Sequence, residues 1–227
     1  MKEKIFVKKS VLKKEKVLTP GNMVISLLFM LLFISFSVAV TLNFRPLYYF
    51  DIQYLDIEAY SGLEEEVIRK NYDVLIDYNS MFYDGELEFP SLVMSESGRI
   101  HFQEVKNIFV GLQYLLIVDF LVCAALLAYK IRKKSFAFLK LAGIVTIVVP
   151  AALGGLIAWN WDWVFVTFHQ IAFNNDYWIF NAVTDPVITI LPDTFFMHCA
   201  LLILLLVILC AVVCLVSGSL LDRRSRI

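Results

Sequence analysis

Residues 108–159 read IFVGLQYLLIVDFLVCAALLAYKIRKKSFAFLKLAGIVTIVVPAALGGLIAW, which is two apolar runs joined by a short basic segment. Each run, 108–129 and 138–159, is close to the roughly 20 residues that an α-helix needs to cross about 30 Å of membrane hydrocarbon. Five residues in 130–140 are Lys or Arg, and basic connections between membrane helices are typical of the cytoplasmic side. This stretch therefore predicts a hairpin of two transmembrane helices with its connection inside the cell.

Two further apolar runs, 24–42 and 197–216, have a similar length and composition. The first follows a basic N-terminus, as in a signal peptide, but it is longer than the roughly 7 to 15 apolar residues of such a peptide and has no small-x-small cleavage site, so it is predicted to remain as an anchor. With 227 residues, 59% of them hydrophobic, and a mean hydropathy of +0.73, the chain has room for four membrane helices and one modest cap. The predicted fold class is an all-α membrane protein.

The charged residues separate by side of the membrane. Fifteen of the 20 Lys and Arg lie in 1–16, 130–140 and 222–227, whereas 17 of the 21 acidic residues lie in 43–106 and 159–196. Under the positive-inside rule, the basic segments are cytoplasmic and the acidic segments face outward. The cytoplasmic parts are then 1–23, 130–137 and 217–227, and the outer parts are 43–107 and 160–196. The acidic outer face argues against a nucleic-acid partner, and the chain is predicted to be a multi-pass plasma-membrane protein.

The outer segment 43–107 is predicted to form a small cap with mixed α and β structure. Ser61-Gly62-Leu63-Glu64 matches a capping box, in which the Ser and Glu side chains satisfy backbone N–H groups at the start of a helix. That helix is expected to run to about Asn79. Asp84-Gly85 indicates a turn, and residues 86–94, interrupted by a proline, indicate a short extended piece.

The second outer segment, 160–196, is rich in aromatic residues but too often interrupted by Asn and Asp to be a fifth span. Such a segment is expected at the level of the lipid headgroups. Two interpretations remain open: an aromatic belt that anchors the neighbouring helices, and a half-buried floor on which a lipid-like substrate lies. The aromatic residues are Trp161, Trp163, Phe165, Phe168, Phe173, Tyr177, Trp178 and Phe180.

All three histidines of the chain, His101, His169 and His198, are predicted at the outer face of the membrane. His169 lies among apolar residues, where an imidazole needs a polar partner or a chemical task. His101 lies three residues before Glu104, which would share its helical face. His198 begins the fourth span and is interpreted as structural. The spacing of the histidines matches no known zinc-ligand pattern, so no metal or other cofactor is predicted.

Asp119 lies near the middle of the predicted span 108–129. A carboxylate within a membrane is a candidate for a proton relay or ion path, but a hydrogen bond to Thr146 or to a carbonyl explains it equally well. The sequence has no Gly-x-Ser-x-Gly elbow, His-Glu-x-x-His zinc site or Gly-rich phosphate loop. Besides an enzyme, two classes therefore remain open: a non-catalytic sensor or assembly protein, and a small transporter that uses Asp119.

Two segments, SESGRIHFQEVK at 95–106 and FHQIAFNNDYWIF at 168–180, resemble the lipoprotein intramolecular transacylase (Lit) family of Gram-positive bacteria in sequence and in their order relative to the spans. The resemblance covers nearly the whole chain. It implies an intramolecular acyltransferase that moves the sn-2 acyl chain of a diacylglyceryl-cysteine lipoprotein onto its own α-amino group, giving the lyso-form. It also implies diacylated lipoproteins and membrane lipid as partners, and an active site on the outer side.

The same resemblance implies catalytic roles for His101 and His169. An α-amine with a pKa of about 8 must lose a proton before it attacks an ester. His169 is expected to be neutral and to take that proton, whereas His101, near Glu104, is expected to be the more cationic and to stabilise the oxyanion. The reverse assignment is also open. The candidates for orienting the substrate are Tyr72, Asn174, Asp176 and Trp178.

Overall fold

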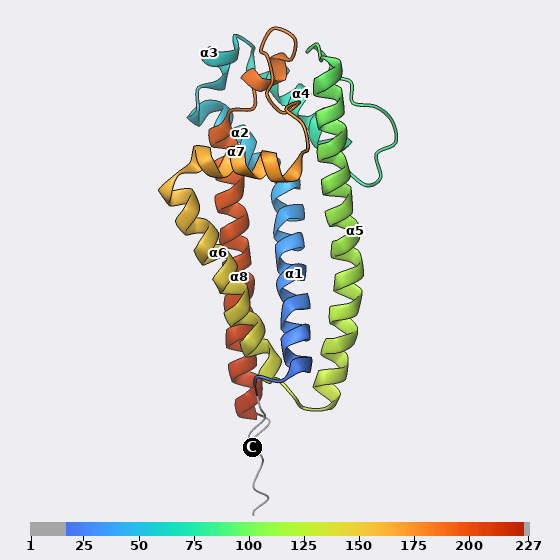
Figure 1. The fold of residues 1–227 in the computed structure, drawn as a ribbon, viewed down its shortest axis with the longest axis vertical. Helices are drawn as coiled ribbons and strands as arrows, with labels where there is room; N and C mark the ends of the chain where they lie inside the picture. The colour runs from blue at the N-terminus through green and yellow to red at the C-terminus, as the bar shows by residue number, and fades with distance from the viewer. Residues whose placement is uncertain (1–16, 225–227) are drawn as a thin grey trace, which may run out of the picture.

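In the computed structural model of the protein, residues 17–224 are described, and within them every regular element is helical (Figure 1). The helices are α1 (Pro20–Asn43), α2 (Arg45–Tyr54), α3 (Ile57–Ser61), α4 (Glu65–Tyr78), α5 (Glu96–Arg132), α6 (Ala137–Trp159), α7 (Trp161–Ala172), the 3₁₀ helix η1 (Pro186–Thr189) and α8 (Asp193–Arg224). Four of them, α1, α5, α6 and α8, are long and apolar enough to cross a membrane. The predicted all-α protein with four such helices is confirmed. The predicted basic segment 1–16 and the last three residues of the predicted tail lie outside the described residues.

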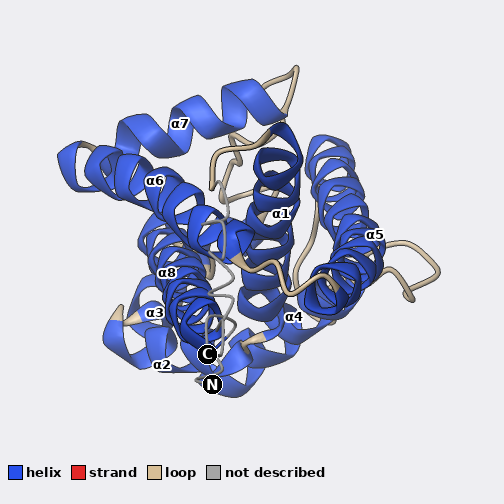
Figure 2. Ribbon diagram, turned by 90° about the horizontal axis from the view of Figure 1, so that it is seen from below, coloured by secondary structure: helices blue, strands red, loops and turns tan. Residues whose placement is uncertain are grey.

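The four long helices form one bundle, in which α1 lies between α5 and the α6–α8 pair (Figure 2). The contact between α6 and α8 is the most extensive. It is close because Gly143 of α6 faces Ala211 and Leu215 of α8, and a Cβ at Gly143 would overlap both. Most of the apolar surface of the four helices faces away from the bundle, since only 11–28% of their most apolar windows is buried. These faces need lipid to cover them.

The α5 helix is much longer than its predicted span. Its 37 residues extend over about 55 Å, against roughly 30 Å of hydrocarbon. The additional residues, 96–107, precede the apolar run and carry the helix into the cap (Figure 1). His101 therefore lies on a rigid helix that continues from the bundle rather than on a loop.

The cap has one hydrophobic core, to which residues 43–107 and 160–196 both contribute. Residues of α2, α3 and α4 pack with Phe102 of α5 and with Val187, Ile190 and Leu191 from the segment before α8. Tyr48 is fully buried at the centre and donates a hydrogen bond to the carbonyl oxygen of Ile190 at 2.6 Å. The two segments are therefore one structural unit, although they are far apart in the sequence.

The predicted β component of the cap is wrong, because residues 86–94 form no strand. An extended piece needs a neighbouring strand to satisfy its backbone groups, and within residues 17–224 none is present. The predicted capping box is also wrong. Ser61 is the last residue of α3, Gly62 ends that helix in the left-handed conformation with φ 72°, and α4 begins after Glu64 without a side-chain cap.

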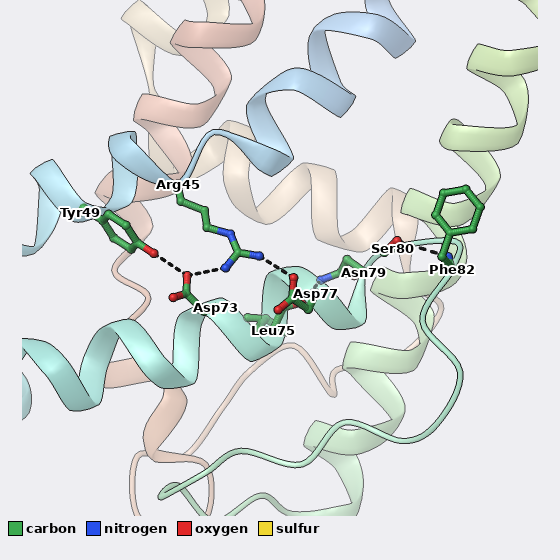
Figure 3. Close-up of polar contacts among 8 residues, drawn as sticks. All are labelled: Arg45, Tyr49, Asp73, Leu75, Asp77, Asn79, Ser80 and Phe82. Carbon is green, nitrogen blue, oxygen red and sulfur yellow. Dashed lines mark hydrogen bonds and ion pairs between the residues drawn. The ribbon is translucent and has the colours of Figure 1, made fainter.

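A polar cluster joins α2 to α4 on the outside of the cap (Figure 3). The Arg45 guanidinium is paired with Asp73 at 2.9 Å and with Asp77, and the Tyr49 hydroxyl donates to Asp73 at 2.7 Å. All of these groups are partly exposed, so each ion pair contributes little to stability. Their effect is to fix the orientation of α4 relative to α2, above the buried tyrosine core.

Candidate active site

The α7 helix lies roughly perpendicular to the four long helices, beneath the cap (Figure 1). Asn160 caps it, since its side-chain oxygen accepts a hydrogen bond from the Trp163 backbone N–H at 2.9 Å. Its 12 residues extend over about 18 Å, too short to cross a membrane. Trp163, Phe168 and Ile171 expose apolar side chains. This geometry is typical of an amphipathic helix in the plane of a membrane interface.

The end of α7 brings His169 next to His101 on α5. The two imidazole ring centroids are 6.2 Å apart, although 68 residues separate the histidines in the sequence. Phe173, the residue that follows α7, contacts both rings, with centroid distances of 4.7 Å to His101 and 5.7 Å to His169. The two histidines, which the sequence places at separate spans, are therefore neighbours in the structure.

The tautomer of His169 follows from its hydrogen bond. Its Nδ1 lies 2.8 Å from the carbonyl oxygen of Phe165, one turn earlier on α7. Because a carbonyl only accepts, Nδ1 carries the proton and Nε2 of the neutral ring carries a lone pair. Burial lowers the pKa of His169, and the hydrogen bond to Phe165 partly opposes this shift. At neutral pH, His169 is thus an uncharged imidazole with one basic nitrogen.

His101 lies ahead of the predicted span 108–129 and is more deeply buried, with 5% of its surface exposed. Burial, and next the proximity of His169, lower the pKa of His101 to about 4. Its Nδ1 is buried and has no hydrogen-bond partner in the described part of the chain. The expectation that His101 is the more cationic histidine is therefore wrong. The physical reason is that burial and the nearby His169 disfavour the imidazolium, while the Glu104 carboxylate bonds to Asn175 and not to His101.

Residues 173–180, which we call the aromatic loop, close the site from the side of the cap. Besides Phe173, the loop contributes Trp178, whose ring centroid is 4.8 Å from that of His169, and Phe180, which is 5.5 Å from His101. The indole nitrogen of Trp178 is buried and, among residues 17–224, has no partner. Asn175 donates to Glu104 Oε1 at 2.9 Å and thereby fastens the loop to α5.

The other predicted substrate-binding residues occupy different places. Asn174 and Asp176 are exposed on the aromatic loop, on either side of Asn175. Tyr72 is buried in the cap core and stacks on Tyr48 with a centroid distance of 3.7 Å. The structure thus brings Trp178 to the histidine pair, and it leaves Tyr72 outside that group. The contributions of Asn175 and Phe180 were missed, because nothing in the sequence relates an amide or a ring to a partner 71 or more residues away.

His198 and Asp119 both lie outside the histidine pair. His198 Nδ1 is 2.9 Å from both carboxylate oxygens of Asp51, which is fully buried. Asp119 accepts a long hydrogen bond from the Cys123 thiol on the same helix at 3.6 Å. The bond to Thr146 that the sequence suggested is absent, since within the described residues the Thr146 hydroxyl has no partner. Residues 17–224 contain no group of three or more His, Cys, Asp or Glu side chains that could hold a metal ion.

Gly98 is the residue that lets α5 approach the aromatic loop one turn before His101. A Cβ at this position would overlap the Asp185 carboxylate and would lie 3.2 Å from the Phe180 ring. Asp185 is itself buried and accepts from the Ser95 backbone N–H at 2.8 Å, which holds the start of α5. The start of α5 and the ring beside His101 are therefore fixed by the same close contact.

We expect Gly98→Ala to destabilise the protein by about 1–3 kcal/mol, because the added methyl group overpacks this contact. Gly111→Ala is the matched control, since Gly111 lies on the same helix and no atom lies within 4 Å of its added Cβ. Alanine is a better helix former by about 1 kcal/mol, so the control is expected to be neutral or slightly stabilised. Thermal unfolding in detergent measures both variants, and equal stability of the two would contradict the packing argument.

Comparisons with known proteins point in one direction. The family model of the lipoprotein intramolecular transacylase Lit matches residues 23–196, a range that includes both histidines of the pair. The structure is similar to that of the membrane-integral lipoprotein intramolecular transacylase Lit from Bacillus cereus, with a TM-score of 0.88 and 38% identity over 90% of this chain and 95% of that chain. Two further structures of that enzyme carry one histidine replaced by arginine or by alanine. Each has a TM-score of 0.82 and 38% identity over 90% of this chain, and the match covers 92% of the arginine variant and 93% of the alanine variant. No protein with a curated description matches the sequence.

Proposed function

The chain belongs to the lipoprotein intramolecular transacylase (Lit) family, and on that premise we propose that it moves the sn-2 acyl chain of a diacylglyceryl-modified lipoprotein onto the α-amino group of the same lipidated cysteine. The product is the lyso-form, with an N-acyl cysteine that keeps one acyl chain on its glyceryl group. The observation that carries this proposal is the pair of uncharged histidines, 6.2 Å apart, between an interfacial helix and the cap. An ester at the membrane surface and an amine on the exposed peptide can both reach that position.

The reaction needs a base but no nucleophile from the enzyme, because the substrate supplies its own amine. The cationic α-ammonium first loses one proton to solvent through His169 Nε2. The amine nitrogen then attacks the ester carbonyl carbon, a C–N bond forms, and the nitrogen loses its second proton to Nε2. When the bond from the carbonyl carbon to the sn-2 oxygen breaks, Nε2 returns that proton to the leaving oxygen, which becomes a hydroxyl group. The result is an amide and an alcohol in place of an amine and an ester.

His101 is suited to stabilise the oxyanion as a neutral donor. Its pKa, lowered to about 4 by burial and by His169, leaves it uncharged at neutral pH, and a neutral imidazole still carries one N–H. Such a donor can polarise a carbonyl oxygen without being an imidazolium. The surrounding Phe173 and Phe180 rings exclude water from the developing charge, which strengthens the hydrogen bond.

The aromatic loop is proposed to orient the two parts of the substrate. The Trp178 indole N–H is buried and has no acceptor among residues 17–224, so a carbonyl oxygen of the lipid ester would satisfy it. Asn174 and Asp176 are exposed on the same loop and are proposed to contact the peptide that follows the lipidated cysteine. Tyr72 contributes through the cap core on which the loop packs.

The proposed reaction is an isomerisation, so the mass of the lipoprotein does not change, and the test must locate the acyl chain. We expect tandem mass spectrometry of a lipoprotein N-terminus to yield fragments with an acylated cysteine nitrogen when this chain is expressed. Without the chain, the same peptide should carry a free α-amine and two acyl chains on its glyceryl group. A free amine in both samples, at verified expression, would overturn the proposed function.

The site is proposed to face the outside of the plasma membrane, where mature lipoproteins are located, with both termini in the cytoplasm. Single cysteines at the exposed positions Asp84, Val183 and Lys133 test this orientation. We expect a membrane-impermeant maleimide to label positions 84 and 183 in intact cells, and position 133 only after permeabilisation. The parent protein, whose four cysteines lie in α5 and α8, gives the background. Labelling of position 133 in intact cells would reverse the orientation.

A further inference from the structure

The Glu104 carboxylate is only half satisfied. Its Oε1 accepts a hydrogen bond from the Asn175 side chain at 2.9 Å, whereas its Oε2 is buried and, among the residues that the structure describes, has no donor. Among the described residues, no Lys, Arg or His forms an ion pair with Glu104. A buried carboxylate oxygen without a donor is costly, and its presence in a native protein calls for a ligand that supplies one.

The position of Glu104 connects this oxygen with the histidine pair. Glu104 lies one turn after His101 on α5, so both side chains project from the same face of the helix. Its partner Asn175 belongs to the aromatic loop, which contacts His101 through Phe173 and His169 through Trp178. The carboxylate is therefore linked to His101 through α5 and to both histidines through the aromatic loop.

A cavity of about 230 Å³ reaches Glu104 from the surface of the cap. Apart from Glu104, it is lined by Tyr78, Leu87, Ile100 and Gln103 and by Arg99 and Glu86. Arg99 and Glu86 are paired with each other, which leaves Glu104 as the unpaired charge of this lining. A cationic group in the cavity would meet the Glu104 side chain but neither histidine, since neither of them lines it.

We propose that Glu104 binds the α-ammonium group of the lipidated cysteine and holds it beside the histidines; this inference rests on the proposed transacylation. The chemistry fits, because a primary ammonium with a pKa of about 8 is mostly charged at neutral pH and has three donors. One donor satisfies Oε2, and a second is left to face the base. The amine is thus held in its resting, protonated state one helical turn from His101.

A purely structural role for Glu104, as the acceptor that fastens the aromatic loop, makes a different prediction. Glu104→Gln separates the two roles, because the glutamine oxygen still accepts from Asn175 while the charge is lost. Ammonium binding then becomes weaker, but only at a pH at which the amine is charged. Burial keeps the pKa of both histidines below their ordinary value of about 6.5, so both are mostly neutral from pH 6.5 upward, whereas the substrate amine titrates between pH 6.5 and about 9.

The experiment compares KM for a diacylglyceryl-cysteinyl lipopeptide in detergent micelles at pH 6.5 and at pH 9. We expect Glu104→Gln to raise KM about 10- to 100-fold at pH 6.5, as for loss of a charged hydrogen bond, and to approach the parent value at pH 9. Glu96→Gln is the matched control, since Glu96 lies on the same helix but its side chain is exposed and paired with Arg99; its KM should stay unchanged. An effect of Glu104→Gln that is equal at both pH values, or no effect at all, would overturn ammonium binding.

If the variant does not fold, the parent protein decides the question with two unreactive ether-linked lipopeptides, one with a free amine and one with an acetylated amine. At pH 6.5 the free amine should inhibit about 10- to 100-fold more tightly than the acetylated form, and equal inhibition would overturn the proposal. Transacylation by the parent protein is measured first. If the parent protein shows none, both the proposed function and this inference are overturned. A failure of the pH comparison alone leaves the proposed function standing.

Discussion

Replacing His169 with asparagine is expected to lower lyso-lipoprotein formation about 10²- to 10⁴-fold while the protein remains folded. The asparagine amide nitrogen can take the place of Nδ1 and donate to the Phe165 carbonyl, which His169 Nδ1 approaches at 2.8 Å. What asparagine lacks is the basic Nε2, so the variant retains the local structure and loses the proton acceptor. Initial rates with a lipopeptide substrate, measured by tandem mass spectrometry, give the factor.

The same substitution at the other two histidines supplies matched comparisons. His101→Asn should also lose activity, because His101 lies in the same site and is proposed to donate to the reacting carbonyl. His198→Asn should stay active, since its amide nitrogen can still donate to the Asp51 carboxylate, 2.9 Å from His198 Nδ1. A His169→Asn variant that keeps its rate within tenfold of the parent, at equal protein level, would remove His169 from the role of base.

The membrane part of the fold was predictable because it depends on properties that are local in the sequence. Apolar runs of about 20 residues and the basic connection at 130–140 predict four long helices, and these are present. The extension of α5 was not predictable from hydropathy, since residues 96–107 are mainly polar. The error at residues 86–94 has a related cause: whether an extended segment becomes a strand depends on a neighbouring strand, which local sequence cannot supply.

For the candidate site, the positions of the histidines relative to the membrane helices were predictable from local sequence, but their charge states were not. The depth of His101 and His169 follows from their distance to the spans, and the structure places their rings 6.2 Å apart. Their electrostatics depend on contacts across the sequence. Glu104 bonds to Asn175, 71 residues away, and not to His101, which is one turn away. The sequence-based division into one neutral and one cationic histidine therefore failed, and the structure gives two neutral imidazoles.

The second large effect is expected at the Asp51–His198 pair, which joins α2 of the cap to α8 of the bundle. Asp51 is fully buried, and His198 Nδ1 lies 2.9 Å from both of its oxygens. His198→Ala leaves this carboxylate without its partner, which typically costs about 3–5 kcal/mol. We expect the melting temperature in detergent to fall by roughly 10 °C. A histidine that only snorkelled at a helix end could be replaced by alanine without such a loss.

A double variant and a change of pH test the cause of that loss. Burial raises the pKa of Asp51, and the hydrogen bond and charge of His198 oppose this rise. Without His198, the pKa of the folded state rises further above the value of about 3.9 in the unfolded chain. The folded state then takes up a proton first as the pH falls, so His198→Ala should regain stability between pH 7.5 and pH 5.

Asp51→Asn combined with His198→Ala has no charge to bury, so it should be more stable than His198→Ala at pH 7.5 and should show no such recovery. If the double variant is as unstable as the single one at both pH values, the loss arises from the packing of the imidazole and not from the buried carboxylate.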